Sequence, residues 1–227
     1  MIFRQLFDPD TSTYTYIVGD ADRGEAVIID PVRENVERDL SVIGAVGMRL
    51  TCILETHVHA DHVTGARALR QRTGAITAVN ARCGASGFDR LFDDGEFMVF
   101  GNEVIRVIAT PGHTLGSSCF LWRDRLMTGD TLLIGGCGRT VFQNGDAGTM
   151  YDSITTRLFT LPADTLVYPG HDYRARRVST IGEEKATNPR LAGRTREQFI
   201  TLMNNLDLPL PARLAEAVPA NLLGGTA

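Results

Sequence analysis

The sequence predicts an α/β protein in which short strands alternate with helices. Apolar and β-branched runs recur along the chain, and the stretches between them repeat their apolar residues at helical spacing. With 227 residues, 43% of them hydrophobic, the chain can bury the core of one substantial domain. We therefore expect a single domain over residues 1–227, with a mainly helical segment from about residue 178 onward.

The individual elements follow from local patterns. Residues 14–18 and 26–29 read as two strands around a polar turn, and Val36, Leu40 and Ile43 lie on one face of a helix that ends before Gly47. Further strands are expected at 2–6, 50–54, 76–79, 96–100, 104–109, 118–122, 126–127 and 165–168. Further helices are expected at 65–72, 150–161, 181–187, 195–206 and 211–217.

Charge and composition argue against several classes of protein. The net charge of -4 is not that of a general nucleic-acid binder, and no apolar run reaches the length of a membrane span. The four cysteines lack CxxC spacing and are too few for a disulfide scaffold, which fits a reducing, cytoplasmic location. Because the first strand begins almost at Met1, we expect neither a signal nor a transit peptide.

The five histidines and two aspartates form the candidate site. Three histidines and one aspartate share residues 57–62 in the pattern HxHxDH, and the other two histidines each follow a Pro-Gly pair. A lone buried histidine is more often a hydrogen-bonded core residue, but imidazoles and carboxylates in this arrangement are typical ligands of a first-row transition metal. The candidate residues are His57, His59, Asp61, His62, His113, Asp130 and His171.

Each group of candidate ligands directly follows an expected strand. In layered α/β folds, the loops past the carboxyl ends of strands gather at one edge and build the site there. We therefore expect the loops after residues 54, 109, 127 and 168 to converge. Asp30 also follows a strand, and we expect it to stabilise a loop rather than to bind metal.

The order and spacing of these residues resemble the metallo-β-lactamase superfamily. The segment from His57 to His62 matches its HxHxDH motif, and His113, Asp130 and His171 match its later ligands. The resemblance covers essentially the whole chain. It implies a four-layer αβ/βα sandwich of two mixed β-sheets, with a metal cleft at one edge. Because this fold hosts several chemistries, the resemblance does not by itself fix the reaction.

Segments after Asp130 resemble one branch of that superfamily. Residues 135–143, GGCGRTVFQ, are similar to the GCGRTDFQ signature of the persulfide dioxygenases, the ethylmalonic encephalopathy protein family. Residues 168–173 (YPGHDY), 188–191 (NPRL) and 217–222 (AVPANL) agree with the same family. Val141 stands where the family usually has aspartate, so no polar role is carried over to it.

The resemblance implies a persulfide dioxygenase with one Fe(II) per chain, held by His57, His113 and Asp130. Three ligands on one face leave positions for a substrate sulfur and for O2. The implied reaction oxidises glutathione persulfide with O2 to sulfite and glutathione, in sulfide oxidation. The residues then expected to orient the ligands through hydrogen bonds are His59, Asp61, His62 and His171.

The implied substrate carries two carboxylates, so its site should contain cations and hydrogen-bond donors. Arg139, Tyr173 and Arg190 lie in the family-like segments and are the candidate substrate-binding residues. A planar guanidinium pairs with a carboxylate through two hydrogen bonds. Arg139 could instead brace its loop, and Cys137 is expected to pack rather than to react. The family likeness also allows a homodimer, which the residues themselves do not reveal.

Two other functions use the same residues. A hydrolase of the glyoxalase II type would bind two metal ions bridged by Asp130 and attack glutathione thioesters. A non-catalytic metal-binding or sulfur-sensing module would bind metal without turnover. Residue types alone do not distinguish iron from zinc or manganese, and neither the carrier thiol nor the proteins that supply the persulfide leave a trace in the sequence.

Overall fold

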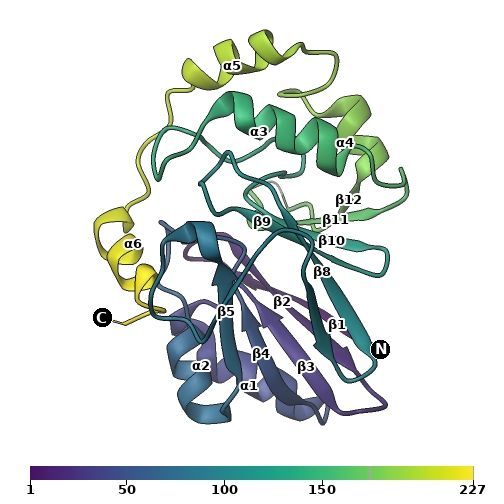
Figure 1. Cartoon of the computed structure of the whole chain (residues 1–227), viewed down its shortest axis with the longest axis vertical. Helices are drawn as coiled ribbons and strands as arrows, with labels where there is room; N and C mark the ends of the chain where they lie inside the picture. Colours follow the sequence, from purple (N-terminus) through teal and green to yellow (C-terminus); the bar gives the residue numbers. More distant parts are fainter. Residues whose placement is uncertain (174, 227) are drawn as a thin grey trace.

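Two six-stranded mixed β-sheets face each other in the computed structural model, which describes residues 1–173 and 175–226 (Figure 1). The first sheet has the strand order β1-β2-β3-β4-β5-β6, and the second has the order β12-β11-β10-β9-β8-β7. Helices pack on the outer face of each sheet (Figure 1). The layers are those of the αβ/βα sandwich that the family resemblance implies.

The first sheet combines an antiparallel and a parallel half. Its strands are β1 (Ile2–Asp8), β2 (Thr13–Asp20), β3 (Glu25–Ile29), β4 (Arg49–Leu54), β5 (Ile76–Asn80) and β6 (Arg90–Phe92). The pairs from β1 to β3 are antiparallel, and those from β3 to β6 are parallel. Parallel neighbours need crossovers, which are made by α1 (Val36–Ala45), after the turn η1 (Arg33–Asn35), by α2 (Ala66–Thr73) and by a segment with the turn η2 (Ala81–Cys83).

The second sheet is antiparallel except between β10 and β11. Its strands are β7 (Phe97–Phe100), β8 (Glu103–Ala109), β9 (Ser118–Trp122), β10 (Arg125–Gly129), β11 (Leu166–Pro169) and β12 (Ser179–Thr180). The parallel crossover contains α3 (Ala147–Ser153) and a π-helical turn, η3 (Ile154–Leu158). The helix expected at 150–161 therefore begins earlier and changes to i→i+5 geometry halfway.

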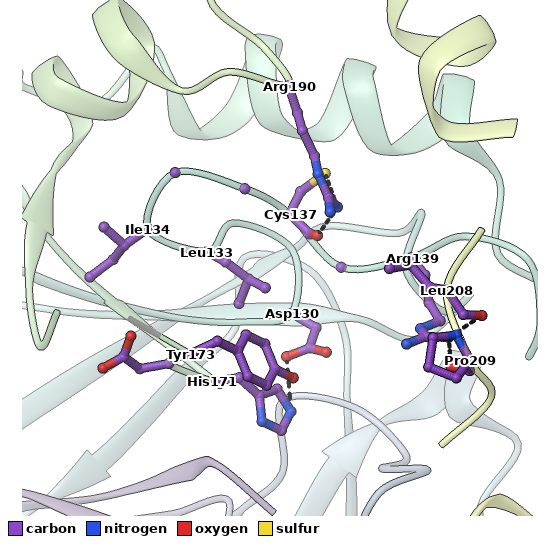
Figure 2. Close-up of a pocket in the computed structure, with 14 residues that line it drawn as sticks. Asp130, Leu133, Ile134, Cys137, Arg139, His171, Tyr173, Arg190, Leu208 and Pro209 are labelled. Carbon is purple, nitrogen blue, oxygen red and sulfur yellow. Dashed lines mark hydrogen bonds and ion pairs between the residues drawn. The ribbon is translucent and has the colours of Figure 1, made fainter. Parts of the chain in front are cut away.

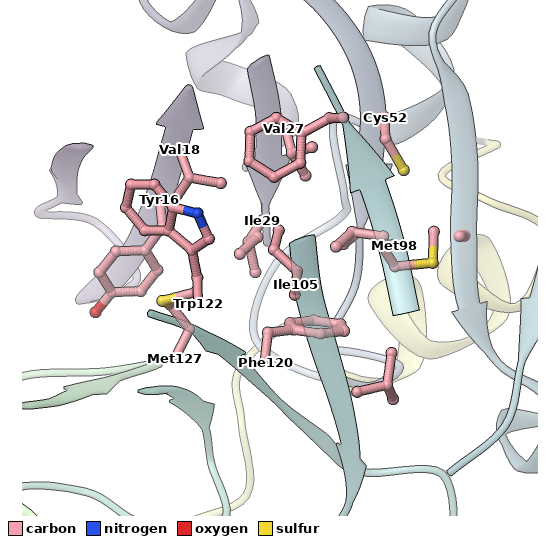
Figure 3. Close-up of a cluster of buried hydrophobic side chains, with 14 of the residues drawn as sticks. Tyr16, Val18, Val27, Ile29, Cys52, Met98, Ile105, Phe120, Trp122 and Met127 are labelled. Atoms are coloured by element: carbon pink, nitrogen blue, oxygen red, sulfur yellow. The ribbon is translucent and has the colours of Figure 1, made fainter. Parts of the chain in front are cut away.

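A hydrophobic cluster between the two sheets holds the sandwich together (Figure 3). Tyr14, Tyr16 and Val18 alternate along β2 and therefore face the same side of the first sheet. Phe120 and Trp122 meet them from β9. The Trp122 indole is fully buried and donates from Nε1 to Glu103 at 2.9 Å, so the one polar atom of this side chain is satisfied.

The described chain after β12 is mainly helical, with α4 (Ile181–Thr187), α5 (Arg196–Asn204) and α6 (Leu214–Leu222). Whereas α4 and α5 lie on the side of the second sheet, α6 returns to the side of the first sheet, where Val218 and Leu222 pack against a cluster that includes Val79 of β5 (Figure 1). The helix expected at 211–217 is wrong in both bounds, because α6 starts later and continues through Pro219. Buried Ala217, Ala220 and Asn221 anchor the helix on both sides of that proline. None of the described helices is long and apolar enough to cross a membrane.

Candidate metal centre

The candidate ligands lie in four loops at one edge of the sandwich. The HxHxDH loop (residues 57–62) follows β4 in the first sheet. His113 follows β8, Asp130 follows β10 directly, and His171 follows β11, all in the second sheet. The expected convergence is seen, and it joins strand ends from both sheets across the core. One donor atom each from His57, His113 and Asp130 lies within 4.8 Å of the others.

Hydrogen bonds fix which nitrogen of His57 and His113 is free. Nδ1 of His113 lies 2.7 Å from the carbonyl oxygen of Arg139, so it must carry the proton and donate. The Thr56 hydroxyl donates its single proton to Asp30 at 2.8 Å and therefore accepts from Nδ1 of His57 at 2.9 Å. In both rings Nε2 is then the nitrogen left with a lone pair. An imidazole binds a metal ion through such a nitrogen.

The chemistry of Asp130 completes a donor set that fits a metal ion. Its Oδ1 is buried and has no hydrogen bond from the described residues, although the His171 imidazole lies 3.4 Å away. An unsatisfied buried carboxylate oxygen is costly, and a cation is the natural partner for it. Close packing also requires glycine next to it, because a Cβ at Gly138 would lie 2.5 Å from the Asp130 carbonyl and 2.8 Å from Nδ1 of His113.

The imidazole of His59 lies within ion-pair distance of two buried carboxylates, those of Asp30 and Glu55. Its Nε2 lies 3.1 Å from Asp30 and 3.2 Å from Glu55. Burial opposes protonation of this ring, but the two carboxylates outweigh burial and raise the pKa of His59 above its usual range. At His57, by contrast, burial and the neighbouring imidazoles lower the pKa well below the usual value, which keeps that ring neutral.

Asp61, His62 and His171 form the outer part of the site. Oδ2 of Asp61 accepts from Nδ1 of His62 at 2.9 Å and from the Thr13 hydroxyl at 3.0 Å. Nδ1 of His171 lies 3.2 Å from the Ser12 carbonyl oxygen, to which it donates. Nε2 of His62 and Nδ1 of His59 are buried without a hydrogen-bond partner in the described residues. His59, Asp61 and His62 therefore offer ligand atoms that could bind a second metal ion as well.

A pocket of about 370 Å³ opens beside Asp130 and His171 (Figure 2). The three candidate substrate-binding residues, Arg139, Tyr173 and Arg190, all line it. The Tyr173 ring stacks on His171 with the ring centroids 5.9 Å apart. Leu133, Ile134, Leu208 and Pro209 form its apolar wall.

Arg139 and Arg190 each donate one guanidinium nitrogen to a backbone carbonyl. Nη1 of Arg139 donates to the Pro209 carbonyl at 2.6 Å, and Nη1 of Arg190 donates to the Cys137 carbonyl at 2.5 Å. Arg139 thus braces its loop, which is the role expected as the alternative to substrate binding. It still lines the pocket, where its remaining N–H groups are available. Cys137 is 2% exposed, and burial raises the pKa of its thiol to about 11, which agrees with a packing role.

Some residues of the site could not be predicted from sequence patterns. Glu55 and Thr56 flank the motif without belonging to it, and Asn221 reaches the loop from the C-terminal helix. The only signal for Asn221 is its place in the AVPANL segment. Asp30 does stabilise a loop, since its carboxylate accepts from the Thr56 amide at 2.7 Å. The side chain of Val141 is 62% exposed and lies outside the lining of the pocket, so an apolar residue is tolerated there.

Comparisons with known proteins place this geometry in a family. The family model of the metallo-beta-lactamase superfamily matches residues 8–171. The persulfide dioxygenase ETHE1, mitochondrial, of Homo sapiens is 44% identical over 227 residues, which cover 99% of this chain and 89% of that protein. The crystal structure of ETHE1 from Myxococcus xanthus superposes with a TM-score of 0.98 at 52% identity and covers 100% of both chains.

A hydrolase relative is more distant. The hydroxyacylglutathione hydrolase of a Polaromonas species is 36% identical over 166 residues, which cover 70% of this chain and 62% of that protein. The likeness to this hydrolase therefore leaves out a large part of both chains, whereas the likeness to the two ETHE1 proteins extends over nearly the whole sequence.

Proposed function

The chain belongs to the metallo-β-lactamase superfamily and, within it, to the persulfide dioxygenases, and we propose that it oxidises glutathione persulfide with O2 at one Fe(II) ion per chain. The observation that carries this proposal is the near full-length identity to persulfide dioxygenases, combined with a convergent His57, His113 and Asp130 donor set. Together with one water molecule, which supplies the third oxygen of sulfite and the proton of the released thiol, the persulfide and O2 give sulfite and glutathione.

Two imidazoles and one carboxylate suit the proposed ion. His57 and His113 each use Nδ1 in a hydrogen bond and leave Nε2 for a metal ion, and Asp130 has a buried oxygen that no described residue hydrogen-bonds. These three residues would hold Fe(II) and would leave it able to bind two further small ligands. When bound, the iron supplies the redox chemistry that joins a persulfide sulfur and O2, which amino-acid side chains cannot provide.

The surrounding residues are proposed to hold the ligands in place. The His171 ring is held by the Ser12 carbonyl, and its Nε2 lies 3.4 Å from Oδ1 of Asp130, so in its protonated form it can orient the carboxylate by charge. Asp61 and His62 pair with each other, and His59 is held by Asp30 and Glu55. In this proposal none of these four motif residues binds the catalytic ion.

The pocket beside Asp130 is proposed to bind the glutathione part of the substrate. The free donors of Arg139 and Arg190 are suited to its carboxylates, because a guanidinium forms two parallel hydrogen bonds with each. The hydroxyl of Tyr173 offers one further donor at the same opening. Leu133 and Leu208 cover the apolar side and reduce the access of water to the reacting sulfur.

Two assays on one preparation test the proposal against the hydrolase. Oxygen uptake that depends on glutathione persulfide, with sulfite as product, is the expected result. Hydrolysis of a glutathione thioester without oxygen uptake would identify the glyoxalase II type instead. A His113→Ala variant is the control, because a non-catalytic metal-binding module would show no more oxygen uptake than this variant. The cytoplasmic location and the homodimer stay predictions.

A further inference from the structure

The HxHxDH loop has to be held by partners outside itself. Residues 57–62 form neither a helix nor a strand, so their backbone carbonyls have no regular ladder to join. They are nevertheless almost entirely buried, and a buried carbonyl needs a donor. The residues that supply these donors therefore hold the loop, and with it His57, in position.

Two side-chain amides supply the donors. Nε2 of Gln143 donates to the Val58 carbonyl at 2.8 Å. Nδ2 of Asn221 donates to the His59 carbonyl at 2.9 Å and to the His62 carbonyl at 2.8 Å. The two amides come from distant parts of the chain and meet the loop at both ends.

Neither amide side chain has a role in the catalytic proposal, although both lie in segments that resemble the family. Gln143 ends the GCGRT-x-FQ segment, and Asn221 lies in the AVPANL segment on α6. Oδ1 of Asn221 also accepts from the Thr64 amide at 2.9 Å, so this buried side chain, 2% exposed, directs both its donor group and its acceptor at one loop. Neither side chain touches the pocket beside Asp130.

We propose that Gln143 and Asn221 are positioning residues that together form an amide clamp on the metal loop and set how slowly the metal ion is released. The clamp rests on the proposed role of His57 as a ligand. A carbonyl only accepts, so only a donor can hold it, and an amide does so without bringing a charge near the metal. Val58 follows His57 directly, and its carbonyl is the one that Gln143 holds.

The expected effect is on metal retention rather than on folding alone. Residues that orient ligands from outside typically change metal affinity by about 10–100-fold when they are replaced. We expect each neutral, donor-free variant, Gln143→Met and Asn221→Leu, to release the bound ion at least about tenfold faster than the unmodified chain. Neutral replacements are chosen because an added carboxylate would itself attract the cation.

The test measures the release of Fe(II), and of Co(II) as a second ion, into an excess of chelator, together with the thermal midpoint of each metal-free protein. Ala215→Gly is the control, because this exposed position lies on the same helix as Asn221 and glycine lowers helix stability by up to about 1 kcal/mol without touching the loop. The clamp predicts fast release in the amide variants and unchanged release in the control. If Asn221→Leu does not fold, Asn221→Ser, which keeps a short donor, is expected to give an intermediate rate.

Release at the unmodified rate in both amide variants would overturn the clamp. The clamp would also be overturned if the release rate correlated with the thermal midpoint in the same way in all variants, the control included. The amides would then act only through the stability of the protein. If the unmodified chain retained no metal, the proposed function would fail first, and the release assay would show this before any variant is compared.

Discussion

Asp30 connects the end of β3 to the metal loop, and its removal gives a quantitative test of that connection. Its side chain is 1% exposed and accepts from the Thr56 amide at 2.7 Å, from the Thr56 hydroxyl at 2.8 Å and from His59 at 3.1 Å. Its backbone lies in the left-handed region, with φ of 52°. Asp30→Ala therefore changes both the hydrogen bonding and the backbone strain of this corner.

The magnitude follows from what each partner can do without the carboxylate. The Thr56 amide is left buried without an acceptor, which costs about 1–3 kcal/mol. The Thr56 hydroxyl can turn, and His59 keeps Glu55 at 3.2 Å, so neither adds a comparable loss. An alanine in the left-handed region costs about 1 kcal/mol more. We expect Asp30→Ala to lower the free energy of unfolding by about 3 kcal/mol.

The assay is urea unfolding of the metal-free protein at neutral pH, followed by tryptophan fluorescence and circular dichroism. Asp30→Asn is the matched variant, because asparagine tolerates the left-handed region and keeps one acceptor for the Thr56 amide, so it should cost less than Asp30→Ala. A loss below about 1 kcal/mol for Asp30→Ala, with an unchanged urea dependence, would refute the assigned role of Asp30.

Three further predictions concern the ligands, a thiol and the dependence of stability on pH. Asp130→Ala should remove both iron and activity, whereas His171→Ala should weaken iron binding by about 10–100-fold and keep measurable activity; equal loss of metal in the two variants would contradict the mononuclear site. Because burial raises its pKa to about 11, the Cys137 thiol should stay unlabelled by thiol reagents at neutral pH unless the protein is unfolded; rapid labelling of the folded protein would contradict its packing role. Burial raises the pKa of Asp39 to about 6 despite the Arg38 guanidinium beside it, so the stability that its protonation contributes is complete below pH 3.8 and is lost as the pH rises through 6. Asp39→Asn should remove this part of the pH dependence in unfolding curves, and identical pH profiles would show that Asp39 titrates normally.

The loops that carry the candidate ligands could be predicted from the sequence because each depends on local signals. The buried run at 50–54 is a strand by composition alone, and the HxHxDH pattern follows it directly. His113, Asp130 and His171 likewise follow strands that local patterns identify. Since strand ends in such folds meet at one edge, the convergence of His57, His113 and Asp130 follows from element assignments that need no long-range information.

Other features depend on contacts that no local pattern records. β6 has only three residues and exists because β5 pairs with it, while η3 changes helix geometry within a uniformly helical pattern. The bonds from Asn221 to the metal loop join residues 159 and 162 positions apart, so spacing gives no hint of them. The same holds for the Arg139 contact with the Pro209 carbonyl, 70 positions away, which decides how many of its donors remain for substrate.

Metal content measured against turnover tests the central claim most directly. The protein is purified without added metal, its iron and zinc are counted per chain, and persulfide-dependent oxygen uptake is recorded on preparations loaded with increasing amounts of Fe(II). We predict that uptake rises in proportion to iron and levels off at about one ion per chain. Saturation at two ions per chain, or full loading with iron and no oxygen uptake, would contradict a single iron centre held by His57, His113 and Asp130.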